Sequence, residues 1–281
     1  SVFITTGVYG VSAPIDVGTN VHVRGTGLPE ETVIDGGGAG RCFNIASSNA
    51  VVSDLSITGG NASGAYVADG GRLERCIVHG NQSAPGENGG GVLVETDGLV
   101  WNCLVKDNYC DGLGGGMYIV GRGAQISHCT VAANQAGNVG GGIYATDQSF
   151  IRNSIIYFNQ GGSFYGHNTW GSGEYYYGCT TPLPVHEYNV IIDEPDFLAM
   201  SAGDYRLKYG SVAIDAGNHH SAADPPLDLH GVERPIDGDG DEVSKYDLGC
   251  YEYDPAAQDS DGDGLSDADE DGLHGTNPLL P

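Results

Sequence analysis

The chain has 281 residues and a mass of 29.2 kDa, enough for one large domain and a small appendage. Its 47 glycines follow no Gly-X-Y period, which excludes collagen, and its 40% apolar content argues against general disorder. Eleven basic and 37 acidic residues give a net charge of −26, which disfavours nucleic acid as a partner because both would be negative.

The acidic excess lies mainly in the last third of the chain. Residues 193–281 contain 22 acidic and 4 basic residues, whereas residues 1–192 contain 15 and 7. This asymmetry predicts a tail that collects cations. No stretch reaches the ~20 apolar residues of a membrane span, and the chain begins at Ser1 without a signal-peptide pattern. We therefore expect a processed, secreted protein of the cell surface.

The first 36 residues alternate apolar and polar positions, as strands with one inward face do. Val21-His22-Val23-Arg24-Gly25 and Thr32-Val33-Ile34-Asp35-Gly36 resemble the opening of bacterial right-handed β-helix proteins of the pectin-lyase-like superfold. In that family a short amphipathic helix usually precedes these strands and caps the first turn. Its absence leaves two hypotheses: a truncated chain, or a first turn covered by a second copy, head to tail, which would build filaments.

Residues 56–159 repeat with a period of about 25 residues, which indicates a solenoid. Each unit has a Gly-rich turn, a short strand, a second short strand and an Asn turn. The glycine runs begin at Gly89, Gly114 and Gly140. The strands are too short for helices, and the period is too short for propeller blades. The pattern predicts an all-β protein, a right-handed parallel β-helix with strands ~4.8 Å apart.

Two residue types recur at fixed places in this repeat. Asparagine closes the units at Asn81, Asn108, Asn134 and Asn159, and Asn61 is placed in the same register one unit earlier. Asparagine suits corners that need left-handed backbone, and stacked side chains can bond to one another. Cysteine occupies one column at residues 76, 103 and 129. This column favours a ladder of buried thiols over a metal site or disulfides.

An aromatic cluster follows the last clear repeat. It consists of Phe164, Tyr165, Trp170, Tyr175, Tyr176 and Tyr177 in a Gly-rich segment. Such rings could stack on sugars or on another subunit, or could form the small core of a loop packed on the solenoid. The residues we select as a glycan or subunit contact are Trp170, Tyr175, Tyr176 and Tyr177.

The repeat stops at residue 193. The segments Gly210-Ser211-Val212-Ala213-Ile214-Asp215-Ala216-Gly217 and Asp247-Leu248-Gly249-Cys250-Tyr251-Glu252 resemble the C-terminal half of bacterial choice-of-anchor Q β-helix proteins. The resemblance implies a surface or secreted protein and little about activity. We divide the chain into a β-helix (1–192), a C-terminal module (193–253) and a tail (254–281). We expect the module to add irregular turns and to cover the C-terminal end, with Asp215 as a turn residue. Cys179 and Cys250 are a candidate disulfide.

The tail contains a complete 12-residue D-x-D-x-D-G-x₅-E loop, residues 259–270. Alternating carboxylates and one backbone carbonyl point into one cavity, which is the chemistry of a calcium site. The flanks are not EF-hand helices, and the segment resembles a single bacterial thrombospondin type 3 repeat. The predicted calcium ligands are Asp259, Asp261, Asp263, Leu265 through its carbonyl, Asp267 and Glu270.

A second, weaker calcium site is predicted at residues 237–247. Asp237, Asp239, Asp241 and Asp247 are its candidate ligands. Glu242 stands where the motif has glycine, and the last position lacks glutamate.

The pattern favours a structural protein over an enzyme. Lyase or glycosidase chemistry needs a cationic base or two carboxylates at a set separation. The acidic residues on the repeat are scattered, namely Asp54, Glu74, Asp107, Asp111 and Asp147. We therefore predict a secreted, calcium-binding scaffold that assembles head to tail. The alternatives are a carbohydrate-binding adhesin that contacts extracellular polysaccharide and, third, a polysaccharide lyase or hydrolase.

Overall fold

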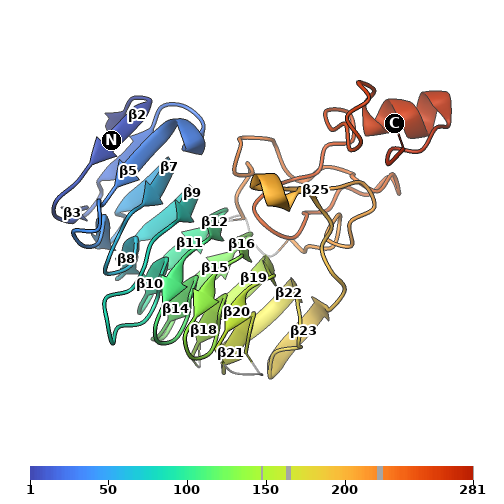
Figure 1. Ribbon diagram of the computed structural model, residues 1–281. Coiled ribbons are helices and arrows are strands. Elements are labelled where there is room, and N and C mark those ends of the chain that lie inside the picture. The colour runs from blue at the N-terminus through green and yellow to red at the C-terminus, as the bar shows by residue number, and fades with distance from the viewer. Residues whose placement is uncertain (147, 163–165, 220–223, 281) are drawn as a thin grey trace.

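The computed structural model describes residues 1–146, 148–162, 166–219 and 224–280. The chain coils from its first strand to β23 as a parallel β-solenoid, in which each strand lies beside its equivalent from the next turn (Figure 1). The predicted fold class is confirmed. No helix in the described part of the chain is long and apolar enough to cross a membrane.

The largest sheet has thirteen parallel strands in two adjoining tracks. Its strands are β1 (Val2–Ile4), β2 (Gly7–Gly10), β4 (His22–Gly25), β5 (Thr32–Asp35), β7 (Val51–Thr58), β9 (Arg72–His79), β11 (Leu99–Trp101), β12 (Leu104–Lys106), β15 (Gln125–Ser127), β16 (Thr130–Ala132), β19 (Phe150–Tyr157), β22 (Glu174–Thr180) and β23 (His186–Ile191). The long strands β7, β9, β19 and β22 cross both tracks, so the two tracks form one bent sheet.

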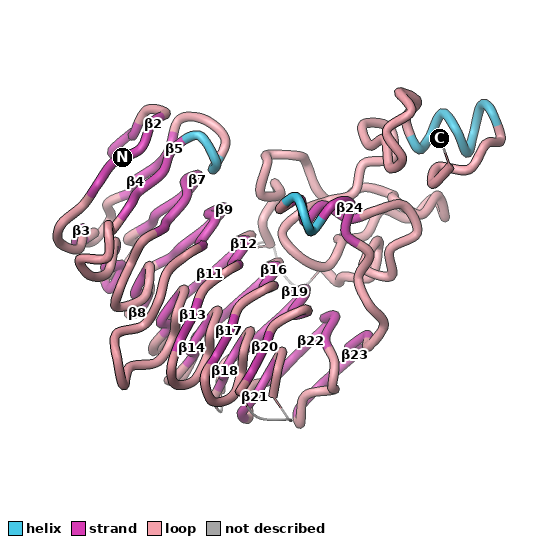
Figure 2. The backbone as a smooth tube through the Cα atoms, viewed as in Figure 1, coloured by secondary structure: helices cyan, strands magenta, loops and turns pink. Residues whose placement is uncertain are grey.

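Two smaller parallel sheets complete each turn (Figure 2). The seven-stranded sheet contains β3 (Ile15–Asp16), β6 (Phe43–Ala46), β8 (Ala65–Ala68), β10 (Val92–Val94), β14 (Met117–Ile119), β18 (Ile143–Ala145) and β21 (Thr169–Gly171). The three-stranded sheet contains β13 (Tyr109–Cys110), β17 (Gln135–Ala136) and β20 (Gln160–Gly161). Apolar side chains from the thirteen-stranded and seven-stranded sheets fill the interior, because alternate residues of each strand point inward.

The bend between the two tracks lies at one left-handed residue in each turn. Asp54, Arg75, Asn102, His128 and Asn153 occupy this position, with φ between 44° and 58°. A left-handed residue turns the chain sharply and projects its side chain outward from the corner. The result is a column of polar side chains along the outside of the solenoid, which the C-terminal module contacts.

The predicted asparagine ladder is confirmed. The Nδ2 group of each asparagine donates to the Oδ1 of the next, from Asn81 through Asn108 and Asn134 to Asn159, at 2.9 to 3.0 Å. Each Nδ2 also donates to a backbone carbonyl of the preceding turn. The predicted place of Asn61 in this ladder is wrong. The Gly60 N–H donates to Asn81 Oδ1, so Gly60 occupies the position that precedes Asn81 in the ladder.

All seven cysteines are free thiols, and all are buried. Cys76, Cys103 and Cys129 stack inside the solenoid, as the ladder of thiols predicts. The predicted disulfide is wrong: Cys179 packs with Ile155 and Leu207, whereas Cys250 packs with Ile77 and Leu104 in a separate cluster. Burial raises the pKa of Cys42 to about 11 and that of Cys179 to about 12, so these thiols are poor nucleophiles.

The C-terminal module packs along the side of the solenoid instead of adding turns to its end (Figure 1). Its regular elements are the antiparallel pair β24 (Phe197–Ala199) and β25 (Asp204–Leu207) and the short helix η2 (Met200–Ala202). Tyr205, Leu229 and Tyr251 cover Ile77 and Leu104, whose side chains point outward from the second track. Its far end reaches helix η1 (Pro29–Glu31), where His230 Nε2 lies 2.9 Å from Glu30 Oε1.

Candidate functional site

The 259–270 loop brings three carboxylates together in the tail. Oxygen atoms of Asp259, Asp261 and Asp263 lie within 4.8 Å of one another. Backbone N–H groups of the loop fix their orientation: Gly262 and Gly264 donate to Asp259, and the Asp263 N–H donates to Asp261. The side chains converge because acidic residues alternate along a tightly turned backbone. This cluster could hold a metal ion.

Two carboxylate oxygens in this loop are buried without a hydrogen-bond partner in the described structure, Asp261 Oδ2 and Glu270 Oε2. Glu270 is 1% exposed, at the start of the short helix η3 (Asp269–His274). Burial raises the pKa of Glu270, a hydrogen bond with Thr276 acts in the opposite direction, and the charges of Asp261, Asp263 and Asp267 raise the pKa further. Buried carboxylate oxygens beside like charges are costly without a proton or a cation, so a positive charge bound here would be stabilising.

Asp267 is a predicted ligand, but its carboxylate is engaged in hydrogen bonds with the protein. It is fully buried, and it accepts hydrogen bonds from the Ser260 N–H (2.8 Å), Ser260 Oγ (2.7 Å) and Tyr253 Oη (2.6 Å). Both of its oxygens are thus occupied by protein donors. Asp267 ties the loop to Tyr253 at the end of the C-terminal module.

The second acidic loop folds as the first one does. Asp237 accepts the N–H groups of Gly240 and Glu242, as Asp259 accepts those of Gly262 and Gly264. Glu242 has φ 69°, in the left-handed region that its counterpart Gly264 occupies at φ 99°. The missing glycine therefore does not prevent the turn.

The second cluster has a different membership from the prediction. Asp215 joins Asp237 and Asp239, with oxygens within 4.8 Å of one another. Asp241 pairs with Lys245 (3.1 Å). Asp247 is buried, its oxygens accept the N–H groups of Asp215 and Tyr253, and burial followed by the Glu252 charge raises its pKa well above the ordinary value. The cluster in the structure thus contains Asp215, Asp237 and Asp239, and the predicted ligands Asp241 and Asp247 lie outside it.

Asp215 is also the turn residue that the sequence predicts. It accepts N–H groups from Gly238, Asp239 and Lys245. Burial raises its pKa, while these backbone bonds act in the opposite direction. Its position 22 residues before Asp237 hides its membership in the cluster, because no local spacing rule connects the two segments.

A cavity of about 470 Å³ lies between the two acidic loops. Asp237 and Asp239 line it from one side, and Asp267 and Asp271 line it from the other. Tyr209 and Ile214 add apolar surface. The second cluster therefore faces this space through Asp237 and Asp239, whereas Asp259, Asp261 and Asp263 are not among the residues that line it.

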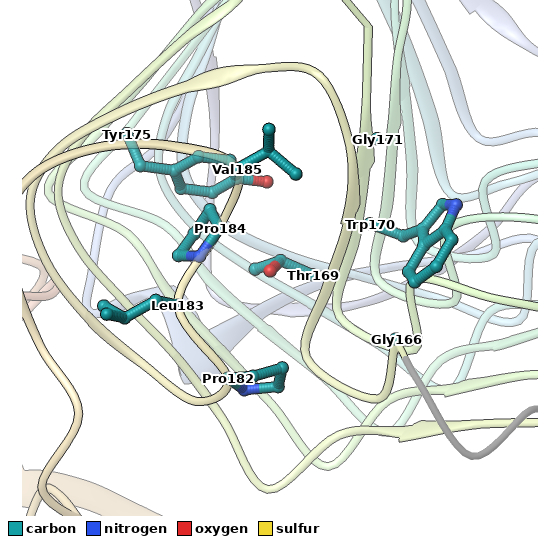
Figure 3. A pocket seen from close by; sticks show the side chains of 9 residues that line it. All are labelled: Gly166, Thr169, Trp170, Gly171, Tyr175, Pro182, Leu183, Pro184 and Val185. Atoms are coloured by element: carbon teal, nitrogen blue, oxygen red, sulfur yellow. The ribbon is translucent and has the colours of Figure 1, made fainter.

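The aromatic residues selected as a contact do not form one surface. Tyr175 is 3% exposed and belongs to the solenoid core, but with Trp170 it lines a cavity of about 350 Å³ that is closed on one side by Pro182 to Val185. Tyr176 stacks on Tyr188, with ring centroids 4.7 Å apart, and Tyr177 packs with the module. Trp170 is 44% exposed on the other side of the turn, pointing away from Thr169 and Tyr175 (Figure 3). Phe164 and Tyr165 lie outside the described residues.

The enzyme alternative has two Ser–His pairs as candidates among the described residues. In one, Ser53 Oγ lies 2.8 Å from His22 Nε2 but donates its proton to Asp54 Oδ2 instead of to the histidine. The other lies on β15 and at the corner that follows it. Ser127 Oγ lies 2.9 Å from His128 Nδ1, and His128 Nε2 lies 2.9 Å from Asn153 Nδ2. The Asn153 amide is oriented by Asn218, whose N–H and carbonyl it binds, so Nδ2 donates to His128. His128 therefore carries its proton on Nδ1 and donates to Ser127, the wrong direction for a general base.

The scattered carboxylates Asp54 and Glu74 are held by arginines. Asp54 lies 3.0 Å from Arg24 and 2.8 Å from Arg75, and Glu74 lies 2.7 Å from Arg72. These contacts neutralise both carboxylates on the outer face of the first track. Asp147 lies outside the described residues.

The chain was compared with protein-family models, curated proteins and solved structures, and it matches none of them. The solenoid and the two acidic clusters are therefore the features of the chain that bear on its function.

Proposed function

We propose that the protein is a secreted, calcium-binding structural protein of the cell surface. The observation that carries the proposal is the pair of buried, unpartnered carboxylate oxygens, Asp261 Oδ2 and Glu270 Oε2, beside Asp259 and Asp263. A divalent cation in this loop removes the repulsion and supplies the missing partner for both oxygens.

Calcium fits these ligands better than other common metals. The donors are carboxylate oxygens, and the Leu265 carbonyl is the backbone donor that the motif predicts; hard oxygen donors favour calcium or magnesium over zinc or copper. A flexible loop with five or more oxygens suits the larger calcium ion, whereas magnesium keeps most of its water. Calcium sites of extracellular modules bind with dissociation constants of ~10⁻⁴ to 10⁻³ M, which agrees with a role outside the cell.

The rest of the chain supports a structural role. Stacked turns share rows of apolar residues, the asparagine ladder and continuous parallel sheets, so stability accumulates along the solenoid axis. We further propose that residues 193–253 are a module of the choice-of-anchor Q type and that the tail is a thrombospondin type 3-like repeat. In this proposal the metal orders the tail at the junction with the module.

Metal binding is tested by calorimetry and thermal unfolding with calcium, with magnesium and with chelator. At a calcium concentration 100 times the dissociation constant, the native state gains ~2.7 kcal/mol. Glu270→Gln with Asp261→Asn should abolish most of the gain. Asp271→Asn, an exposed neighbour, is the matched control that removes one charge and should keep it. Absence of calcium binding to the unaltered protein would refute the proposal.

Assembly is a separate part of the proposal. Strand β23 pairs only with β22 among the described strands, and Val185, Tyr188 and Ile192 near it are 79%, 54% and 52% exposed. An unpaired strand beside apolar side chains is a site for end-on contact with a second copy. Sedimentation velocity with calcium should show growth with concentration that Val185→Asp reduces. A monomer at every concentration would reject assembly and leave the calcium result standing.

A further inference from the structure

A straight row of five outward side chains runs along the seven-stranded sheet. It is formed by the middle residues of β8, β10, β14, β18 and β21, which pair in register from one turn to the next. These residues, called the aromatic row below, are Tyr66, Leu93, Tyr118, Tyr144 and Trp170. The C-terminal module covers the thirteen-stranded sheet and leaves this row outside its contacts (Figure 1).

Two of the row's tyrosines contact each other, and a third is covered by an arginine from a neighbouring segment. The rings of Tyr118 and Tyr144 stack with centroids 5.3 Å apart and planes 27° apart. The Arg41 guanidinium lies 5.2 Å from the centroid of the Tyr66 ring. Trp170 ends the row with 44% of its surface exposed, and its indole points out of the turn (Figure 3). The row is thus a pre-arranged, partly exposed strip of rings and hydroxyl groups.

The shape of the strip selects the kind of partner. Four of its five strands pair on both edges, so their backbone groups are used within the sheet and an added strand cannot pair there. A stable protein interface takes ~800 Å² from each side, and a strip one side chain wide between turns does not provide it. A linear sugar chain laid along the axis meets one side chain of the row at every turn, a ring at four of the five levels and Leu93 at the other, because the rise of one turn is about the length of one sugar unit.

Charge selects among sugar chains. The charged groups that contact Tyr66 have opposite signs, Arg41 over its ring and Glu95, whose Oε2 accepts the Tyr66 hydroxyl at 2.8 Å. The chain as a whole carries −26 and repels polyanions. We propose that the aromatic row is a binding site for a neutral linear polysaccharide, with Trp170 as the stacking platform and tyrosine hydroxyls as hydrogen-bonding groups. The site is independent of calcium.

The chain provides a matched control, because its two tryptophans lie on different sheets. Trp170 is in the aromatic row, and Trp101 lies on β11 of the thirteen-stranded sheet, beside Arg72. Calorimetry with cellohexaose should show binding to the unaltered protein and to Trp101→Ala. Trp170→Ala should weaken it about tenfold, as the loss of one well-exposed stacking ring does. Hexagalacturonate is the anionic oligosaccharide for comparison, and it should bind more weakly than cellohexaose.

A second measurement covers the case in which Trp170→Ala fails to fold. In the Trp101→Phe variant, Trp170 is the only tryptophan of the chain and the row is intact. Cellohexaose should shift the fluorescence emission of Trp170. Tyr144→Phe in that background keeps the stacking and should weaken the shift. No heat and no emission shift with cellohexaose would overturn the proposal, as would equal losses in Trp101→Ala and Trp170→Ala. Tighter binding of hexagalacturonate would overturn the assignment to a neutral sugar.

Discussion

The ladder asparagines show what one side chain contributes to a buried corner. Asn108 Oδ1 accepts both the N–H and the Nδ2 of Asn81, while its own Nδ2 donates to Val78 O and to Asn134 Oδ1. The chain turns here inside the protein, where backbone groups of neighbouring turns cannot reach water. An amide carries a donor and an acceptor at the right separation, and no other side chain of this size does.

We expect Asn108→Ala to lower the free energy of unfolding by about 3 kcal/mol, because it leaves several buried donors and acceptors without partners. Urea unfolding followed by circular dichroism measures the change. Asn61→Ala is the control, since Asn61 lies outside the ladder and should cost less than about 0.5 kcal/mol. Similar losses at the two positions would contradict the ladder as the reason.

Short-range patterns explain which elements could be predicted. The strands, the asparagine column and the cysteine column repeat at a fixed period, so the sequence alone predicts them. The aromatic row was within reach as well, since the middle residue of each strand after a glycine run belongs to it, as in Met117-Tyr118-Ile119. The burial of Tyr175 and the role of Asp215 could not be predicted, because they depend on where a strand ends and on contacts between distant segments.

The contact between helix η1 and the C-terminal module should respond to pH. The hydrogen bond with Glu30 raises the pKa of His230 above its usual 6.5, against burial and the Arg206 charge and aided by Asp228. Burial and the Asp204 charge raise the pKa of Glu30, yet the bond from His230 outweighs them and holds it below 4.5. The stabilisation that comes from protonated His230 is complete below pH 6.5 and is lost as the pH rises through the raised pKa of His230. The stabilisation that comes from ionised Glu30 is complete above pH 4.5 and is lost as the pH falls through the lowered pKa of Glu30.

The pair therefore stabilises the contact most between about pH 4.5 and 6.5, by about 0.5 kcal/mol because both groups are partly exposed. Thermal unfolding of the unaltered protein and of His230→Gln, from pH 3 to 9, measures this term. The difference between the two should be largest near the middle of that window and should shrink at both extremes. A difference that is constant across the range would show that the contact is not ionic.

As a whole, the molecule is a rod with a strap along one side. The strap, residues 193–253, is bound by an apolar cluster over the second track, and within the strap Arg234 forms a buried ion pair with Glu252 (2.8 Å). Arg234 also donates to Asn102 Oδ1 at the corner between the tracks. The same strap carries Asp215 and Asp247, which shape the second acidic loop. The position of the two acidic loops thus depends on how the strap packs against the rod.

We expect Leu229→Ala to loosen the strap before the rod. Leu229 is 1% exposed in the cluster with Ile77 and Leu104, so its truncation leaves a cavity and should cost about 3 kcal/mol. The strap has little regular structure of its own, whereas the turns of the rod support one another through continuous sheets. Hydrogen exchange should therefore speed up in residues 193–253 more than in β9 to β19. Leu280→Ala, at a side chain 66% exposed, should change neither, and equal loss of protection in rod and strap would mean that they unfold as one unit.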